Sequence, residues 1–199
     1  MRRIALASAV LLLLGSSAQA QDTFSLDFRG GPSFATADLA EASLKTGASL
    51  GVTASYRVFN HMRIYGGWDW THFVTDEPFE GNEFDVEPNG YAFGMQFQHP
   101  MAGSIAGWLR AGGLYNHIEL ESEAGDIIDS GHELGWEAGA GIRVPISSRL
   151  AFTPGVRYRA FSADLNVDGE KIPVDMKFVS AEIGLSLSFG SSSVAALIK

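Results

Sequence analysis

The segment Val179–Phe189 constrains the fold of this chain more than any other part of its sequence. Its odd positions are apolar and its even positions are small or polar: Val179, Ala181, Ile183, Leu185, Leu187 and Phe189 against Ser180, Glu182, Gly184, Ser186 and Ser188. Successive side chains of a β-strand point to opposite faces, so this segment predicts a strand with one apolar and one small polar face. Such a strand suits a soluble sheet or a membrane barrel, and the location of the protein must decide between them.

The first twenty residues predict export from the cytoplasm. Arg2 and Arg3 precede the apolar run Ile4–Leu14, and Ala18-Gln19-Ala20 fits a signal-peptidase site. All three regions fit a cleaved secretory signal peptide over residues 1–20, which disfavours the alternative of a buried N-terminal helix. Cleavage after Ala20 would leave 179 of the 199 residues, starting at Gln21, which is not the cysteine that a lipid anchor needs. An exported chain with alternating strands indicates a barrel in a bacterial outer membrane.

The same alternation recurs in seven further segments. They are residues 24–34, 48–58, 62–73, 90–98, 105–116, 133–144 and 150–159. Two residues fit this pattern poorly. Trp108 falls on the polar face of its segment, and Pro154 cannot donate a ladder hydrogen bond, so we expect a local bulge there. Eight is an even number and the smallest that closes a transmembrane barrel.

The connections between these segments alternate in length. Three are tight (residues 59–61, 99–103 and 145–148) and four are long (residues 35–45, 74–88, 119–131 and 163–174). Outer-membrane barrels have short periplasmic turns and long external loops. The sequence therefore predicts an all-β fold, an eight-stranded antiparallel transmembrane up-and-down β-barrel over residues 21–189, followed by a short periplasmic tail over residues 190–199.

The direction of the two faces separates this barrel from a soluble one. A lipocalin-like barrel would turn its apolar face inward, and it would share the strand count and the export signal. In this chain glycine, serine and charged residues make up one face, and the other carries aromatic residues: Trp68, Trp70, Tyr91, Phe93, Tyr115, Trp136 and Tyr158. Aromatic side chains on the outer wall are typical of the girdles at the membrane interfaces. The pattern favours the membrane barrel.

Composition excludes several other classes of protein. The chain has no cysteine, so it has neither disulfides nor a thiolate metal site. Without Arg2 and Arg3 it has 12 basic and 23 acidic residues, a net charge of −11. Nucleic-acid binding relies on Lys and Arg, and so a chain this acidic is a poor candidate for it.

The closing half of the sequence resembles a known family. The segments Gly135–Ser147 and Leu150–Arg159 resemble small outer-membrane barrels of the OmpA/OmpX and opacity-protein kind, and the strand ending at Phe189 is similar to the assembly signal of such proteins. The resemblance implies contact with outer-membrane lipid and lipopolysaccharide, and assembly by periplasmic chaperones and the outer-membrane insertion machinery. Two features differ from the family. Ten residues follow Phe189, and no peptidoglycan-binding domain is present, so cell-wall anchoring is not implied.

Five charged residues on the inward face form the first candidate site. They occur at similar heights on adjacent strands with alternating sign: Arg29, Arg110, Glu137, Arg157 and Glu182. Buried charges must be paired, so we expect a lumen charge network. It would be either a structural plug or the gate of a narrow pore. The interior of an eight-stranded barrel is just wide enough for side chains to fill, which favours the plug.

Histidines form the second candidate site. His72, His117 and His132 fall on the outward face near the external rim, and His61 and His99 fall in periplasmic turns. Lipid A deacylases are small barrels with a catalytic His on the outer wall and a Ser two residues later. Here those positions are Val74, Glu119 and Leu134. The nucleophile–base pair is therefore missing, and we expect no catalytic residues and no enzyme activity.

Acidic residues form the third candidate site. No Lys or Arg lies between Arg63 and Arg110 or between Arg110 and Arg143, and the expected external loops there are acidic: Asp76, Glu77, Glu80, Glu83, Asp85 and Glu87, then Glu119, Glu121, Glu123, Asp126 and Asp129. Such runs are usually solvated surface, although carboxylates can also bind divalent cations shared with lipopolysaccharide. Because no ordered ligand spacing occurs, the sequence predicts no metal site and no cofactor.

These observations favour a non-enzymatic outer-membrane barrel that acts in envelope integrity or surface interaction through acidic external loops. The alternative is a narrow pore for protons, ions or small solutes. The sequence names no surface ligand.

Overall fold

A computed structural model describes residues 23–37, 43–75, 84–122, 127–167 and 170–190. The described chain forms ten β-strands, in the order β1 Phe24–Ala35, β2 Gly47–Phe59, β3 Met62–Val74, β4 Phe84–Ala102, β5 Ile105–Ser122, β6 Ile127–Asp129, β7 Glu133–Pro145, β8 Leu150–Phe152, β9 Gly155–Val167 and β10 Glu170–Phe189. The expected signal peptide (residues 1–20) and residues 191–199 of the expected tail lie outside the described residues. Within the described chain no helix is long and apolar enough to cross a membrane.

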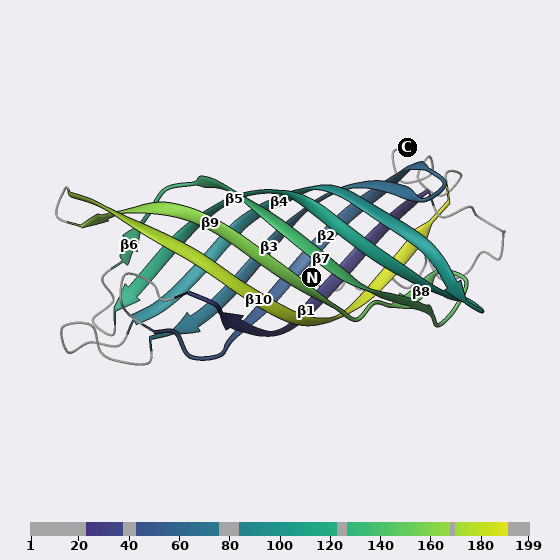
Figure 1. The fold of residues 1–199 in the computed structure, drawn as a ribbon, viewed down its shortest axis with the longest axis horizontal. Coiled ribbons are helices and arrows are strands. Elements are labelled where there is room, and N and C mark those ends of the chain that lie inside the picture. The colour runs from purple at the N-terminus through teal and green to yellow at the C-terminus, as the bar shows by residue number, and fades with distance from the viewer. Residues whose placement is uncertain (1–22, 38–42, 76–83, 123–126, 168–169, 191–199) are drawn as a thin grey trace, which may run out of the picture.

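The strands close into one antiparallel ring. Neighbours along the chain pair from β1 to β5, β5 pairs with β7, β7 with β8 and β9, and both of these with β10. The last strand returns to the first, with Phe24 opposite Phe189. Because β8 and β9 occupy one position, the ring has eight members, and Figure 1 shows their common tilt. This confirms the predicted eight-stranded antiparallel up-and-down barrel.

Pro154 interrupts the seventh predicted strand and divides it into β8 and β9. Backbone groups on either side of the interruption still find partners. Thr153 N donates to Gly184 O at 2.8 Å, and Pro154 O accepts from Ile142 N at 3.0 Å. Pro154, which has no N–H to donate, therefore lies where the strand ladder is interrupted, in line with the local irregularity expected from the sequence.

The tight connections lie at one end of the barrel, beside Phe24 and Phe189 (Figure 1, right). They join β2 to β3, β4 to β5 and β7 to β8. Gly103 occupies the turn after β4 with a φ of 59°, a left-handed conformation that favours glycine. Short turns are a periplasmic feature of outer-membrane barrels, so we call this end the periplasmic end and the opposite one the external end.

The long connections are shorter than predicted. β4 starts at Phe84, inside the expected loop 74–88, and β9 and β10 run on to Val167 and Glu170, inside the expected loop 163–174. The expected loop 119–131 contains the end of β5 and all of β6. The predicted bounds of these three long connections are therefore wrong. Apolar residues that pack inside the extended strands, such as Val86 and Leu165, supply the physical reason.

The outer wall is apolar, as the alternation predicts. Trp68, Tyr91, Phe93, Tyr115 and Trp136 are exposed, whereas Trp70 and Tyr158 are half-buried. On β10, Ile183 and Leu185 are exposed and Ser180, Ser186 and Ser188 are buried. The face that lipid would contact is therefore the apolar one, opposite to the arrangement in a soluble barrel.

Trp108 lies inside the barrel, so the register predicted for the fifth strand is correct. Its indole occupies space left by two glycines, since a Cβ on Gly141 or Gly155 would meet the Trp108 ring at 2.5 or 2.3 Å. Trp108 Nε1 donates to Ile142 O at 3.2 Å, which satisfies its one polar atom. A large aromatic side chain on a polar face is accommodated here by small neighbours.

Candidate functional site

The interior of the barrel holds a cluster of buried charges contributed by five strands. Three of its members are arginines and three are carboxylates: Arg110 (β5), Arg157 and Arg159 (β9), Asp69 (β3), Glu137 (β7) and Glu182 (β10). We call these six residues the lumen network. The number of positive and negative groups is equal. This balance is what a low-dielectric interior requires, because an unpaired buried charge is costly.

Arg157 is the centre of the lumen network and its side chain has no exposed surface. Its Nη2 donates to Asp69 Oδ1 at 2.6 Å, its Nε to Glu182 Oε2 at 2.8 Å and its Nη1 to Glu137 Oε2 at 3.3 Å. A guanidinium carries five N–H donors in a planar fork, so one arginine can hold three carboxylates from three strands. Arg157 thereby ties β3, β7 and β10 together across the lumen.

Arg159, two residues after Arg157 on β9, binds two of the same carboxylates. Its Nη2 lies 3.1 Å from both Asp69 Oδ1 and Glu182 Oε1, and its Nη1 donates to Thr71 Oγ1 at 3.2 Å. Its guanidinium also lies over the ring of Phe178, 5.3 Å from the centroid. Arg159 therefore joins the lumen network to apolar packing above it.

Glu137 connects Arg110 to the rest of the lumen network. Glu137 Oε1 lies 2.7 Å from Arg110 Nη2 and accepts a hydrogen bond from the Tyr65 hydroxyl at 2.7 Å. The Arg110 guanidinium stacks on the Tyr65 ring at 3.9 Å from its centroid. The contact between Arg110 and Glu137 is an ion pair and not a hydrogen bond, because no N–H of Arg110 is aligned with an acceptor within the described residues.

Glycines opposite these long side chains make room for them. A Cβ on Gly51 would meet Asp69 Oδ1 at 2.2 Å, one on Gly112 would meet the Tyr65 hydroxyl at 2.3 Å, and one on Gly139 would meet Arg157 Cγ at 2.8 Å. The alternation of small and large residues is how the interior of a narrow barrel is filled.

The structure brings four of the five predicted lumen charges together, and it separates the fifth. Arg29 is buried, but its guanidinium lies nearer the periplasmic end, 6.0 Å from the Trp108 ring, and within the described residues its Nη1 has no hydrogen-bond partner. The sequence prediction missed Asp69, Arg159 and Tyr65. Asp69 stands at a height similar to the predicted members, so the same criterion extended to the third strand would have found it.

An apolar layer fills the barrel on the external side of the lumen network. Its largest members are inward-facing and fully buried: Phe73, Val86, Leu114, Ile118, Met176 and Phe178. Phe73 and Phe178 meet edge to face at 5.4 Å. The prediction that the inward face carries only glycine, serine and charge is therefore wrong for the external half. The alternation is inverted there: on β10, buried Met176 and Phe178 alternate with the charged, solvent-accessible Asp175 and Lys177.

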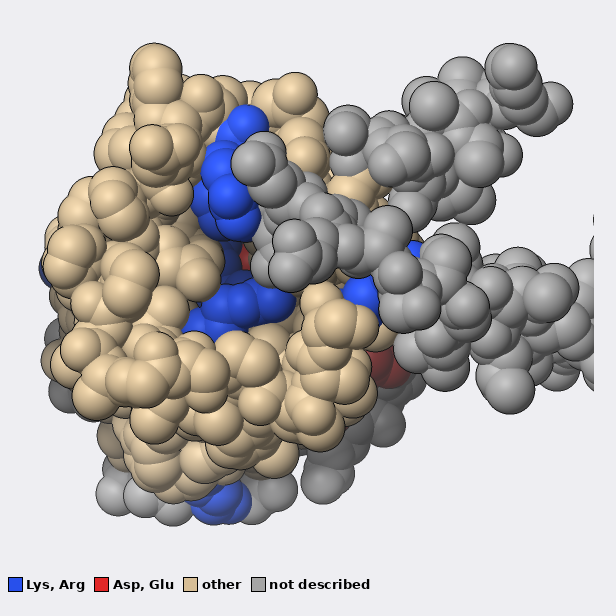
Figure 2. Space-filling model, turned by 90° about the vertical axis from the view of Figure 1, so that its right-hand side faces the viewer, with Lys and Arg blue, Asp and Glu red and all other residues tan. Residues whose placement is uncertain are grey.

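The periplasmic end is hollowed and basic (Figure 2). A small cavity of about 10 Å³ lies there, with Arg29, Arg63, Arg143 and Trp108 among its lining residues. Arg143 donates from Nη1 to Ser186 Oγ at 2.6 Å and from Nη2 to Ser188 Oγ at 2.7 Å. A cavity of this size holds about one water molecule. The hollow thus ends at Trp108 and the lumen network.

The histidines occupy the two ends of the barrel. His61 and His99 lie at the periplasmic end with ring centroids 5.3 Å apart. His72 lies 3.3 Å from Asp85 Oδ1. His117 faces outward as predicted, but it is buried beneath His132, whose ring centroid lies 4.4 Å away, and its Nε2 lies 2.8 Å from Glu119 Oε1.

The predicted acidic residues fall into two groups. Six of them lie outside the described residues: Asp76, Glu77, Glu80, Glu83, Glu123 and Asp126. The others lie on the external ends of β4, β5 and β6: Asp85, Glu87, Glu119, Glu121 and Asp129. Strand register sets them opposite one another, with Asp85 facing Glu121, Glu87 facing Glu119, and Glu119 facing Asp129. We call these five residues the acidic rim.

The whole barrel matches a family of known proteins. The profile of the outer membrane protein beta-barrel domain family matches residues 6–189. The chain belongs to this family. Its members are outer-membrane β-barrels, and this places the protein in the bacterial outer membrane. No curated protein sequence shows a significant match to the chain.

Solved structures show the same fold at low sequence identity. Neisserial surface protein A shares 16% identity over 83% of this chain and 97% of its own, with a TM-score of 0.60. A major outer membrane protein of Thermus thermophilus shares 14% identity over 84% and 98%, with a TM-score of 0.56. OprG from Pseudomonas aeruginosa shares 14% identity over 88% and 100%, with a TM-score of 0.54.

Proposed function

We propose that this outer-membrane barrel is neither an enzyme nor a channel, and that it acts in envelope integrity or surface interaction through its acidic external rim. One observation carries the proposal: two successive layers of side chains fill the described interior. Arg157 and Arg159 are fully buried in the lumen network, and Phe73 and Phe178 are fully buried in the apolar layer above it. A barrel filled in this way leaves its outer surfaces for function.

The acidic rim is the external surface with the most distinctive chemistry. Its five carboxylates lie on segments without Lys or Arg between Arg63 and Arg110 and between Arg110 and Arg143. On the β9–β10 hairpin, by contrast, carboxylates have lysine partners, with Asp164 Oδ2 3.5 Å from Lys171 Nζ and Asp175 Oδ2 2.8 Å from Lys177 Nζ. Carboxylates on segments without Lys or Arg support a role in which divalent cations shared with lipopolysaccharide phosphates link protein and lipid.

The alternative is the narrow pore. Its support is the hollow periplasmic end, where Arg29, Arg63 and Arg143 line a cavity. The apolar layer lies between this hollow and the outside. A conducting path would therefore require Phe73 and Phe178 to move.

Complementation of a deletion strain tests the rim proposal. We expect the strain to admit more of a hydrophobic dye, wild type to restore the barrier, and the double variant Asp85→Asn, Glu121→Gln to restore it only in part. Asp164→Asn, Asp175→Asn is the matched control, because it removes two external carboxylates that have lysine partners. Equal rescue by both double variants would contradict the proposal.

The proposal also covers the two ends of the chain and the assembly of the barrel. We propose cleavage after Ala20, a barrel domain over residues 21–189 and a periplasmic segment after it, with assembly by periplasmic chaperones and the insertion machinery. The intact mass of the protein purified from outer membranes tests the cleavage site. A mass that includes residues 1–20 would contradict it.

A further inference from the structure

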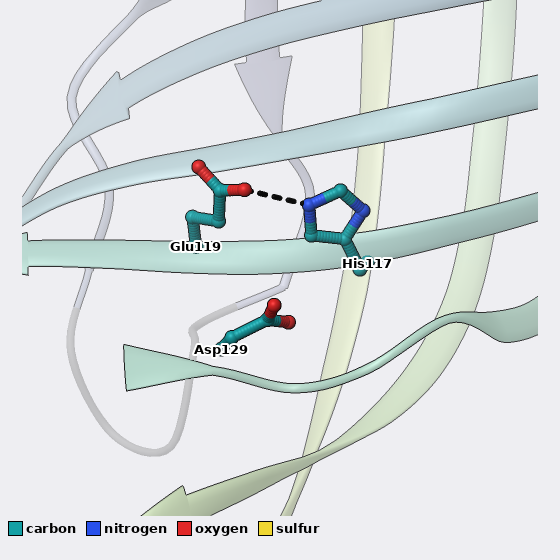
Figure 3. Close-up of side chains that lie close together, drawn as sticks. All are labelled: His117, Glu119 and Asp129. Carbon is teal, nitrogen blue, oxygen red and sulfur yellow. Dashed lines mark hydrogen bonds and ion pairs between the residues drawn. The ribbon is translucent and has the colours of Figure 1, made fainter. Parts of the chain in front are cut away.

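Three side chains of different strands meet on the outward face of the external rim. His117 and Glu119 lie on β5 and Asp129 on β6, and Figure 3 shows the two carboxylates and the imidazole directed toward one another. One potential ligand atom from each lies within 4.8 Å of the other two. His117 Nε2 and Glu119 Oε1 are the closest pair, at 2.8 Å.

The strand register sets like charges opposite one another at this cluster. Glu119 lies directly opposite Asp129 on one side and Glu87 on the other. Like charges directly opposite in a sheet are destabilising. Glu87 accepts a hydrogen bond from Trp70 Nε1 at 3.0 Å, but an indole carries no charge. Residues 64–109 and 111–142, which include these strand segments, contain no Lys or Arg, so no such cation on these segments neutralises the opposed carboxylates.

His117 supplies the observation that points to a ligand. Its exposed fraction is only 9%, and its Nδ1 has no hydrogen-bond partner within the described residues. The His132 ring covers it, with the two ring centroids 4.4 Å apart. Within the described residues, the hydrogen bond of this buried imidazole joins its Nε2 to Glu119 Oε1 of the cluster. An imidazole beside two carboxylates is a donor set for a divalent metal.

The chemistry of this donor set selects the class of cation. One imidazole nitrogen with two carboxylate oxygens suits zinc and similar divalent transition metals, whereas Ca²⁺ and Mg²⁺ prefer oxygen ligands alone. Two ligand atoms each about 2.1 Å from one ion lie about 3.4 Å apart at the tetrahedral angle, so only small side-chain shifts are needed. The Glu119 side chain is 41% exposed, which leaves solvent access to the site.

We propose that His117, Glu119 and Asp129 bind a divalent transition-metal cation of the zinc class on the external rim. The ion joins the end of β5 to β6 and neutralises the opposed carboxylates. Its remaining coordination positions face solvent, where water or an anionic group from outside can occupy them. The site is independent of whether the lumen conducts.

Zinc titration of the refolded full chain in detergent, in the presence of millimolar Ca²⁺ and Mg²⁺, tests this site. We expect one Zn²⁺ per chain by calorimetry. His117→Ala and Asp129→Asn should each weaken that binding at least tenfold. Asn keeps the acceptor that Gly131 N uses on Asp129 at 2.7 Å, so the second variant removes charge with little change in shape.

Two variants serve as matched controls. His72→Ala removes another histidine paired with a rim carboxylate, Asp85, and His99→Ala removes the exposed His61–His99 pair at the periplasmic end. Both should retain the binding, and heat-modifiable gel migration should show every variant folded. Absence of Zn²⁺ binding, unchanged binding in His117→Ala, loss in His72→Ala or His99→Ala, or full displacement by Ca²⁺ would each overturn the proposal.

Discussion

At the scale of single residues, burial and pairing decide what each interior charge contributes. Glu137 contacts Arg110, Arg157 and the Tyr65 hydroxyl, whereas Arg29 contacts only the Trp108 ring among the interactions described. Breaking a buried ion pair by removing one partner costs about 3–5 kcal/mol, because the other charge stays buried. Two charged residues of the predicted lumen network, Glu137 and Arg29, therefore differ in importance, although the sequence pattern treats them alike.

Glu137→Gln should lower the free energy of unfolding by about 3–5 kcal/mol, because it leaves Arg110 without a carboxylate and removes one from Arg157. Replacing Glu137 and Arg157 together should cost less than the sum of the two single changes, because they belong to one network. Urea unfolding of the reconstituted protein measures this cycle. Additive effects would show that the two side chains do not interact.

Arg29→Met should cost less than Glu137→Gln, at most about 1–2 kcal/mol, because no ion pair within the described chain is broken and a buried charge is removed. The same urea experiment makes the comparison. A loss as large as that of Glu137→Gln would place Arg29 inside the lumen network.

At the scale of elements, alternation predicted the eight strands and their two faces, and even the inward position of Trp108. It did not predict that β4, β5, β9 and β10 extend into the expected loops, because charged residues occupy the outward positions there and the pattern of the other strands is inverted. It also missed the apolar layer. Phe178 shares the inward phase of Ser180 and Glu182, but it lies beyond the start of the strand that the sequence predicted, so this phase was not extended to it.

Strand β10 should tolerate a charge at its external end and not at mid-height. Leu185 is 47% exposed on the lipid-facing wall, and Leu185→Arg should cost about 2–4 kcal/mol of folding free energy near the bilayer midplane. Pro173→Arg, which places a charge at an exposed position on the same face of β10 near the end of the extended hairpin, is the control and should be neutral. Ser186→Arg would instead perturb inward packing, where Arg143 already donates to Ser186. Equal folding of Leu185→Arg and wild type in lipid vesicles would contradict the outward assignment.

At the scale of the whole molecule, the barrel is a wall with a filled interior and a chemically distinctive external rim. The periplasmic hollow ends at Trp108, the lumen network holds β3, β5, β7, β9 and β10 together, and the apolar layer closes the external side. Sequence reasoning located the lumen charges because pairing of buried charge is obligatory. It could not predict how completely they are enclosed, since enclosure depends on side chains from every strand at once.

Conductance across a planar lipid bilayer tests this closed interior most directly. Wild type should show no unitary currents under applied voltage, and Glu137→Gln should remain silent despite its lower stability, because the apolar layer is intact. The double variant Phe73→Ala, Phe178→Ala, which removes the two facing rings, should be the first to conduct. Steady single-channel currents from folded wild-type protein would contradict the account.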